Sequence, residues 1–191
     1  MSTFADIGYE AQSGPLDQRL AVQALIIRIG REDDALAVTQ LYAATERVVY
    51  AYILSIIQNP EDTADLVQET YIYVRRSAHL YIPTGKPLAW MLSIARKLAN
   101  DYIRVHKHMP PRNQDTAYDG ITEITDRIIF KHALEILHAE ERQVLFLHAA
   151  AGLRYREIAA YLFIPISSVR TRYRRVADKL KKQLYPLGVS L

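Results

Sequence analysis

Hydrophobic positions recur at intervals of three and four residues along most of the chain, which is the period of an amphipathic α-helix. A first strong segment of this kind begins near Asp34 and extends to Ile57. Asn59 is a preferred N-cap residue and Pro60 suits the first helical position, so a second helix is predicted from there to about His79. No strand-like alternation or hairpin signal stands out, and an all-α fold is expected.

A third helix is predicted to begin at Pro87, after a loop formed by Tyr81–Lys86. The face of this helix that lies opposite its hydrophobic residues is polar and basic. Prolines 110 and 111 cannot continue a helix, so the third helix is expected to end before them. The segment Pro110–Glu123 has the proline-rich, polar and acidic character of a linker. The predicted hydrophobic face of the third helix consists of Leu88, Met91, Leu92, Ala95, Leu98, Ala99 and Tyr102.

Helical periodicity resumes after this linker and stops at Gly152, and a helix-turn-helix pattern follows. Its first helix is Tyr155–Leu162, the break is Phe163-Ile164-Pro165, and Ser167 or Ser168 is expected to cap the second helix. Small polar and long basic residues fall on the outward face, where they suit base edges and phosphates. The second helix is expected to bury Val169, Tyr173, Val176 and Leu180. The predicted DNA-binding residues are Ser167, Ser168, Arg170, Thr171, Arg174 and, on the neighbouring phosphate-facing stripe, Arg172, Arg175, Lys179 and Lys182.

The net charge of +3 is small, but the two signs are separated along the chain. Residues 59–70 contain four acids and no base, whereas residues 166–182 contain seven bases and one acid, which suggests two surfaces with different partners. The chain has no cysteine, no apolar run long enough to span a membrane and no secretion-type start, so a cytoplasmic protein without membrane insertion is expected.

Motifs for catalysis or cofactor binding are missing from the sequence, so an enzyme and a cofactor are not expected. The pair His106-x-His108 could hold a metal weakly, but its place at the basic end of a helix fits phosphate or solvent better. A stand-alone helix-turn-helix regulator remains an alternative, although it would leave the acidic helix without a purpose. Binding to a separate protein complex would distinguish such a regulator from a protein that uses the acidic helix to dock on a partner.

Two segments carry a resemblance to extracytoplasmic-function sigma factors of RNA polymerase. The run GLRYREIAAYLFIPISSVRTRYRRVADKL resembles their promoter-reading domain, and NPEDTADLVQETYIYV resembles their polymerase-docking helix. PLAWMLSIARKLANDYIR is similar to the helix that follows it, which works at the opened promoter. The resemblance implies a sigma domain two at residues 32–108, a linker at 109–124 and a sigma domain four at 125–191. Residues 1–31 form an N-terminal extension to these domains, and the residues leave open whether a further helix forms there at Leu20–Ile29.

The resemblance also implies partners and site residues. Core RNA polymerase would be bound through Asp62, Asp65, Gln68 and Glu69. The −10 promoter element would be held by Tyr81, Thr84, Lys86, Arg96, Lys97, Asn100 and Arg104, and the −35 element by the basic helix described above. Trp90 is expected to serve the core, with base stacking as the alternative. An anti-sigma factor is expected as a partner. The linker, with Asp115, Asp119 and Glu123, would either enter the polymerase or act as a plain tether.

Three positions depart from the pattern of the family: His138, Arg154 and Phe163 replace the proline, the capping Ser or Thr and the glycine that are common there. If the turn at Phe163 requires a positive φ, a bulky residue at that position carries strain. A sigma-like regulator that has lost promoter recognition is therefore a third possibility.

Overall fold

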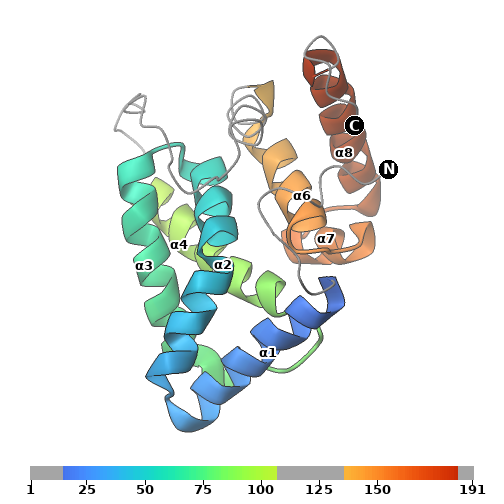
Figure 1. Ribbon diagram of the computed structural model, residues 1–191. Coiled ribbons are helices and arrows are strands. Elements are labelled where there is room, and N and C mark those ends of the chain that lie inside the picture. The colour runs from blue at the N-terminus through green and yellow to red at the C-terminus, as the bar shows by residue number, and fades with distance from the viewer. Residues whose placement is uncertain (1–14, 107–135, 185–191) are drawn as a thin grey trace. The chain divides into compact units, whose positions relative to one another are not determined.

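The computed structural model describes residues 15–106 and 136–184, and every regular element within these ranges is a helix (Figure 1). The helices belong to two compact units, one containing α1 to α4 and the other α6 to α8. The predicted all-α fold with two helical parts is confirmed. The predicted linker, with Asp115, Asp119 and Glu123, lies outside the described residues. So does His108, the second histidine of the predicted pair His106-x-His108.

Within residues 15–106, the first unit contains four α-helices and a short 3-10 helix: α1 (Pro15–Glu32), α2 (Ala35–Ile57), α3 (Pro60–Ser77), η1 (Ala78–Leu80) and α4 (Pro87–Val105). Local capping explains where they begin. The side chain of Asp34 accepts hydrogen bonds from the first amides of α2, and Asn59 does the same for α3. The predicted starts are thus confirmed. The second predicted helix is shorter than expected, because the chain tightens into η1 after Ser77.

Helix α1 extends the predicted candidate Leu20–Ile29 in both directions and packs on the rest of the first unit. Its buried side is formed by Val22, Ile26 and Ile29. Near its end, Gly30 lies so close to η1 that a Cβ atom would stand 2.6 Å from the carbonyl oxygen of Ala78. Only glycine allows this approach of two backbones.

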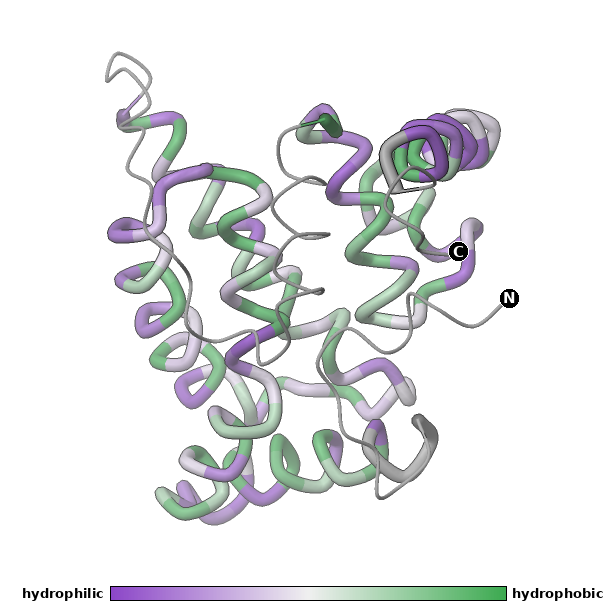
Figure 2. The backbone as a smooth tube through the Cα atoms, turned by 45° about the horizontal axis from the view of Figure 1, so that its top comes forward, coloured by the Kyte–Doolittle hydropathy of each residue, from purple (hydrophilic) through white to green (hydrophobic). Residues whose placement is uncertain are grey.

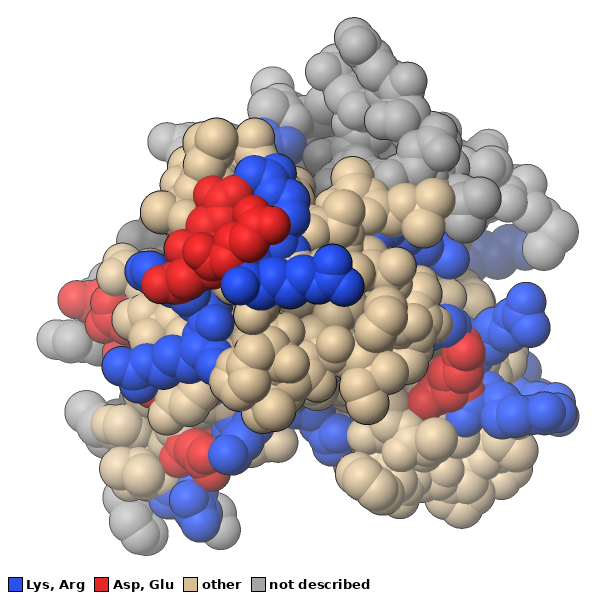
Figure 3. Space-filling model, turned by 90° about the horizontal axis from the view of Figure 1, so that it is seen from below, with Lys and Arg blue, Asp and Glu red and all other residues tan. Residues whose placement is uncertain are grey.

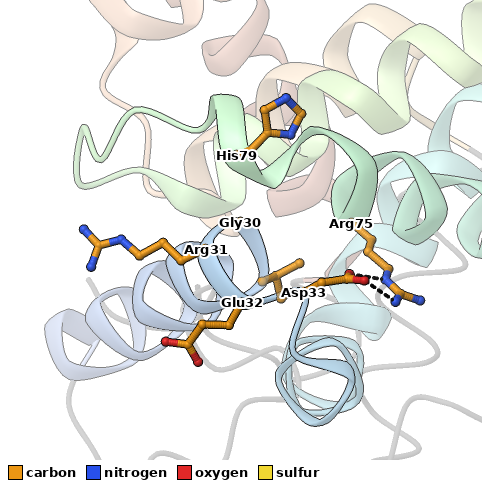
Figure 4. Close-up of a pocket in the computed structure, with 7 residues that line it drawn as sticks. Gly30, Arg31, Glu32, Asp33, Arg75 and His79 are labelled. Atoms are coloured by element: carbon orange, nitrogen blue, oxygen red, sulfur yellow. Dashed lines mark hydrogen bonds and ion pairs between the residues drawn. The ribbon is translucent and has the colours of Figure 1, made fainter.

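The junction between α1 and α2 is tied to α3 by an ion pair. Arg75 donates two hydrogen bonds to the carboxylate of Asp33, with N–O distances of 2.7 and 2.9 Å. Asp33 itself has a positive φ of 48° at this junction. A pocket of about 440 Å³ lies here, in which the side chains of Asp33 and Arg75 point toward each other, and His79 is also among its lining residues (Figure 4).

The core of the first unit is formed where α2, α3 and α4 pack against one another, and the tube in Figure 2 alternates between hydrophobic and hydrophilic stretches along these helices. A buried hydrogen bond of 2.7 Å joins the hydroxyls of Thr45 and Tyr71 across α2 and α3. The predicted burial on the third helix is confirmed except at its two ends, since Leu88 and Tyr102 are only half-buried. The largest fully buried side chains are Ile26, Leu41, Tyr52, Ile53, Met91 and Leu92.

The described part of the second unit comprises α6 (Ala139–Ala149), α7 (Tyr155–Leu162) and α8 (Ile166–Leu184). Leu145 of α6 packs with Val176 and Leu180 of α8 in a buried cluster. Beside this cluster, the ring of His148 contacts both Tyr155 and Tyr173, at centroid distances of 4.9 and 4.8 Å. The predicted buried face of α8 is confirmed, with Tyr173 half-buried in the ring cluster.

Residues 163–165 connect α7 to α8 in a three-residue turn. The amide of Ile164 bonds the carbonyl of Ala159, and the amide of Phe163 bonds the carbonyl of Ala160. These two bonds form a Schellman motif, which requires a left-handed residue after the helix. Phe163 is that residue, with φ 56° and ψ 44°. Its side chain is hardly buried, because 92% of the residue is exposed. The strain expected from the sequence is present.

Candidate functional site

The predicted docking residues of α3 form one exposed face. Asp65, Gln68 and Glu69 are all exposed, while their neighbours Leu66 and Val67 are buried against the unit. Among the described residues, none of the three exposed side chains forms an ion pair or hydrogen bond within the unit. The helix therefore holds two carboxylates and an amide in place while leaving them available to a partner.

Asp62 has a different environment from the rest of the predicted docking face. Its carboxylate accepts a hydrogen bond of 2.5 Å from the hydroxyl of Tyr102 on α4 and a further one from the side chain of Asn59. Partial burial and this carboxylate raise the pKa of Tyr102 to about 12. The ring of Tyr102 also stacks on His106, with centroids 4.1 Å apart. Asp62 thus joins α3 to α4, a role that the sequence analysis missed.

Exposure differs among the residues predicted to hold the −10 element. Thr84 is exposed at the tip of the loop, but Tyr81 is only 8% exposed and its ring packs on Trp90 at a centroid distance of 5.0 Å. The predicted DNA contact of Tyr81 does not fit this position, because the side chain is turned into the unit. Trp90 is half-buried, in agreement with the expected structural role. Lys86, half-buried, precedes α4.

The predicted basic face of α4 is present on the surface. Lys97 and Asn100 are exposed, Arg96 is half-buried, and Arg104 is exposed while it donates a hydrogen bond of 3.0 Å to Asp101 one turn earlier. Exposed ion pairs of this kind are weak, so Arg104 can exchange its partner at little cost.

The N-terminal half of α8 presents polar and basic residues to solvent. Arg170, Arg174 and Arg175 are exposed, whereas Thr171 is half-buried. The two serines do not cap the helix, contrary to expectation. The carbonyl of Pro165 already accepts the amides of Ser168 and Val169, so α8 begins at Ile166 and both serines, 167 and 168, lie within its first turn.

Two of the basic residues predicted to face DNA are engaged within the second unit. Arg172, with 23% of its side chain exposed, pairs with Glu140 at 2.6 Å. Lys179 pairs with the buried Glu141 at 2.7 Å and also donates to the carbonyl of Ile136. Burial opposes the charge of Glu141, but the Lys179 ammonium and the amide of His138 outweigh it and lower the pKa of Glu141. These pairs hold α8 against α6, so neither base is as available as Arg170.

At the start of α7 no side chain caps the helix, and the carbonyl of Arg154 accepts hydrogen bonds from the amides of Glu157 and Ile158. The backbone N–H of Arg154 donates to the carboxylate of Glu157 at 2.7 Å. At the start of α6, the amide of His138 donates to Glu141 at 2.9 Å in the same way. Both departures from the family pattern are thus compatible with well-formed helices, because the glutamate three residues later satisfies the free amide.

The surface also contains features that the sequence analysis did not single out. Ile72 is 51% exposed one turn beyond Glu69, so an apolar group lies at the end of the acidic face. Gln23 of α1 bonds the loop before α4. On the face of the molecule shown in Figure 3, by contrast, acidic and basic side chains lie in mixed groups in which the two signs offset each other. None of the described helices is long and apolar enough to cross a membrane.

Comparison with known proteins adds independent information. The family model of Sigma-70 region 2 matches residues 41–108, and that of Sigma-70, region 4 matches residues 127–180. RNA polymerase sigma factor CarQ of Myxococcus xanthus is 28% identical over 171 residues, which cover 86% of this chain and 97% of the relative. ECF RNA polymerase sigma factor SigK of Mycobacterium tuberculosis (strain ATCC 25618 / H37Rv) is 26% identical over 184 residues, covering 90% and 98%.

Solved structures show the same fold. CnrH, in complex with the cytosolic domain of CnrY, matches with a TM-score of 0.59 and 21% identity over 87% of this chain and 98% of that one. The sigma factor RpoE of Bartonella quintana, in complex with the anti-sigma factor NepR, matches with a TM-score of 0.60 and 20% identity over 77% and 96%. The order of the two family regions, the full-length relatives and the helical fold agree, and the chain belongs to the extracytoplasmic-function (group four) sigma factors of RNA polymerase, which direct promoter-specific initiation of transcription.

Proposed function

We propose that the two units of this sigma factor divide the work between them: the first binds core polymerase and the −10 element, and the second reads the −35 element. The observation that supports this division is the pair of exposed charged faces on α3 and α8. The acidic face is Asp65 and Glu69, and the basic face is Arg170, Arg174 and Arg175. Carboxylates suit a basic protein surface, and arginines suit the major groove of duplex DNA.

The docking surface consists of Asp65, Gln68 and Glu69, with Ile72 as its apolar end. A protein interface gains most of its affinity from a few well-packed groups, and charges around them fix orientation and association rate. Asp62 is excluded from the direct contacts, because its carboxylate is already bound by Tyr102. It acts instead by holding the start of α3 on α4.

Charge reversal tests this docking surface. The double variant Asp65→Lys and Glu69→Lys is expected to lose core binding in a co-elution experiment while its helical circular dichroism stays unchanged. The matched control is Glu32→Lys with Asp178→Lys, which changes the net charge equally at exposed acids elsewhere. Core binding by the first variant at the level of the control would remove the assignment. A chain that binds DNA but ignores core polymerase would contradict the docking proposal as a whole.

The −10 element is assigned to the loop tip and the basic side of α4. Unstacked bases of an opened strand need a pocket or platform beside a basic groove. Thr84 lies at the exposed tip, and Lys97 and Asn100 lie on the exposed side of α4. Tyr81 supports the loop from within. Arg96, Arg104 and Lys86 complete the basic surround.

The −35 element is assigned to the first turns of α8. Arg170→Ala is expected to weaken binding to the cognate duplex by about 1–3 kcal/mol and to relax specificity. Arg172→Ala is the informative companion, because Arg172 is paired with Glu140. We expect its effect on DNA affinity to be smaller than that of Arg170→Ala at equal salt. A larger effect of Arg172→Ala would show that the ion pair breaks when DNA binds. Ser167, Ser168 and Thr171 then contribute hydrogen bonds of secondary weight.

An anti-sigma factor is proposed as a further partner. The titles of both matched structures describe a complex, CnrH with the cytosolic domain of CnrY and RpoE with the anti-sigma factor NepR. For this chain, a regulator that covers the acidic face of α3 would compete directly with core polymerase. Capture of a binding protein that is displaced by core polymerase, and lost in the Asp65→Lys and Glu69→Lys variant, is the expected result. Binding that is indifferent to both would remove this part of the proposal.

A further inference from the structure

One side chain of α1 holds both ends of the loop between η1 and α4. The side-chain oxygen of Gln23 accepts a hydrogen bond of 3.1 Å from the backbone amide of Gly85 and one of 3.3 Å from the hydroxyl of Tyr81. The two donors lie on either side of the loop tip, residues 82–84. A single acceptor atom therefore closes the loop, although it lies 58 residues away from Tyr81 in the sequence.

We call the two hydrogen bonds from Tyr81 and Gly85 to Gln23 the clasp. Neighbouring contacts and backbone conformation hold both Tyr81 and Gly85 in place. The ring of Tyr81 is buried against Trp90, so its hydroxyl oxygen cannot move away from α1 unless that ring contact is lost. Gly85 has a φ of 75°, a conformation that presents its amide to Gln23 and that L residues rarely adopt. Nothing lies within 4 Å of where a Cβ of Gly85 would stand, so its backbone conformation rather than crowding is the constraint.

Helix α1 is itself anchored close to the loop. Val22 and Ile26, which flank Gln23 on the helix, are 5% and 0% exposed. Further along, Gly30 touches the backbone of η1, and Asp33 pairs with Arg75. Gln23 is thus attached to a rigid support, which is what a residue that orients a flexible loop needs.

The loop tip has few other contacts to define its shape. Ile82 is 74% exposed, and Pro83 and Thr84 are exposed as well. The tip would lose its orientation without the clasp, because an exposed loop with no buried groups gains little from burial. The clasp leaves three consecutive exposed residues free for a ligand while holding both ends of the loop.

We infer that Gln23 is a positioning residue for promoter opening: by bonding Tyr81 and Gly85 it holds the loop tip ready to receive an unstacked base of the non-template strand. This inference rests on the proposed role of the loop at the −10 element. It assigns a part of strand capture to α1, which precedes the matched region 2 at residues 41–108. A preorganised loop binds more tightly because less ordering is required on binding.

The test compares three variants in holoenzyme reconstituted with core polymerase. Gln23→Met keeps the length of the side chain and removes the acceptor, whereas Gln23→Glu keeps an acceptor that both donors can bond. Arg19→Met is the control at an exposed position of the same helix. The −10 sequence is first mapped from the start sites of transcripts that the holoenzyme makes. Binding is then measured to single-stranded non-template oligonucleotides that carry this sequence, and to duplex −35 DNA.

Gln23→Met is expected to weaken single-strand binding about threefold to tenfold, the effect of one or two lost hydrogen bonds, and to leave duplex −35 binding unchanged. Gln23→Glu should restore most of the loss, and Arg19→Met should have no effect. Equal single-strand affinity of Gln23→Met and the native chain would overturn the inference, as would failure of Gln23→Glu to restore it.

A readout on the free protein separates this inference from the proposed function of the loop. Hydrogen exchange at the amide of Gly85, followed by nuclear magnetic resonance, should accelerate in Gln23→Met and recover in Gln23→Glu. Unchanged exchange in Gln23→Met would refute the clasp itself. If exchange accelerates while Gln23→Met and Thr84→Ala both leave single-strand binding intact, the clasp exists but the loop does not hold the −10 strand, and the proposed function of the loop fails.

Discussion

Replacing Phe163 with glycine should stabilise the second unit. A left-handed conformation costs a residue with a Cβ about 1–2 kcal/mol relative to glycine. Because Phe163 is 92% exposed, its side chain contributes almost no buried area to offset that cost. Glycine also gives the unfolded chain more conformational freedom, which lowers the stability of the folded state by about 0.4–1 kcal/mol. The expected net stabilisation is therefore about 1 kcal/mol, an unusual sign for the removal of a large aromatic residue.

Alanine provides the matched control at the same position. Phe163→Ala removes the ring but keeps the Cβ, so the strain of the left-handed conformation remains. Its stability should lie within about 0.5 kcal/mol of the native chain, as for most surface substitutions. The difference between the glycine and alanine variants isolates the backbone contribution from any contribution of the ring.

Native-state hydrogen exchange in α7 and α8 of the full chain measures this effect directly. A gain of about 1 kcal/mol slows exchange through global opening about fivefold. Trp90, the only tryptophan, belongs to the first unit, so its fluorescence during unfolding should be unchanged in both variants. Equal protection in Phe163→Gly and Phe163→Ala, or lower protection in Phe163→Gly, would refute the reasoning from strain.

Four further predictions concern contacts between helices. Gly30→Ala should destabilise the first unit by about 1–3 kcal/mol in a denaturant titration, because its Cβ would meet the carbonyl of Ala78, although alanine usually favours a helix. Tyr102→Phe should remove ultraviolet titration amplitude near pH 12 and not near the ordinary tyrosine pKa, because burial and Asp62 raise the pKa of Tyr102 to about 12; amplitude lost near pH 10 instead would contradict the bond to Asp62. Lys179→Met should cost more stability than Glu141→Gln, because it leaves a buried carboxylate unpaired. Because the pKa of Glu141 is lowered in the folded state, the ion pair contributes fully to stability above the ordinary glutamate pKa. This contribution is lost as the pH falls through the pKa of the folded state. Thermal melts of the native chain and of Glu141→Gln between pH 7 and pH 3 test this.

The beginnings of the helices could be predicted because the signals for them are local. Asp34 and Asn59 bond amides two and three residues away, and Pro87 fixes its own φ, so each start follows from a few neighbouring letters. The strain at Phe163 was expected on a different ground: the resemblance to the family places a glycine there, and the expectation held on condition that the turn kept a positive φ, which it does. By contrast, the serines of α8 offered a plausible cap, but the proline turn before them had already started the helix.

Roles that depend on distant partners could not be predicted. Asp62 belongs by its spacing to the acidic face of α3, yet Tyr102, 40 residues later, takes its carboxylate. Tyr81 looked like a loop residue available to DNA, yet Trp90 and Gln23 hold it inside the unit. Helical spacing shows which side chains share a face, but not which of them the neighbouring helix will claim.

The basic residues of α8 illustrate how this limit affects the functional argument. By charge alone they form one surface, but the acids at the start of α6 bind Arg172 and Lys179. These two residues face α6 along with the buried side of α8, whereas Arg170 and Arg174 remain exposed. The same helix therefore uses part of its charge to hold its orientation and part to meet a ligand. On the proposed role of α8 at the −35 element, a helix fixed by its own ion pairs would lose less freedom on binding DNA, and Arg172 and Lys179 would contribute to promoter recognition by keeping the exposed arginines in place.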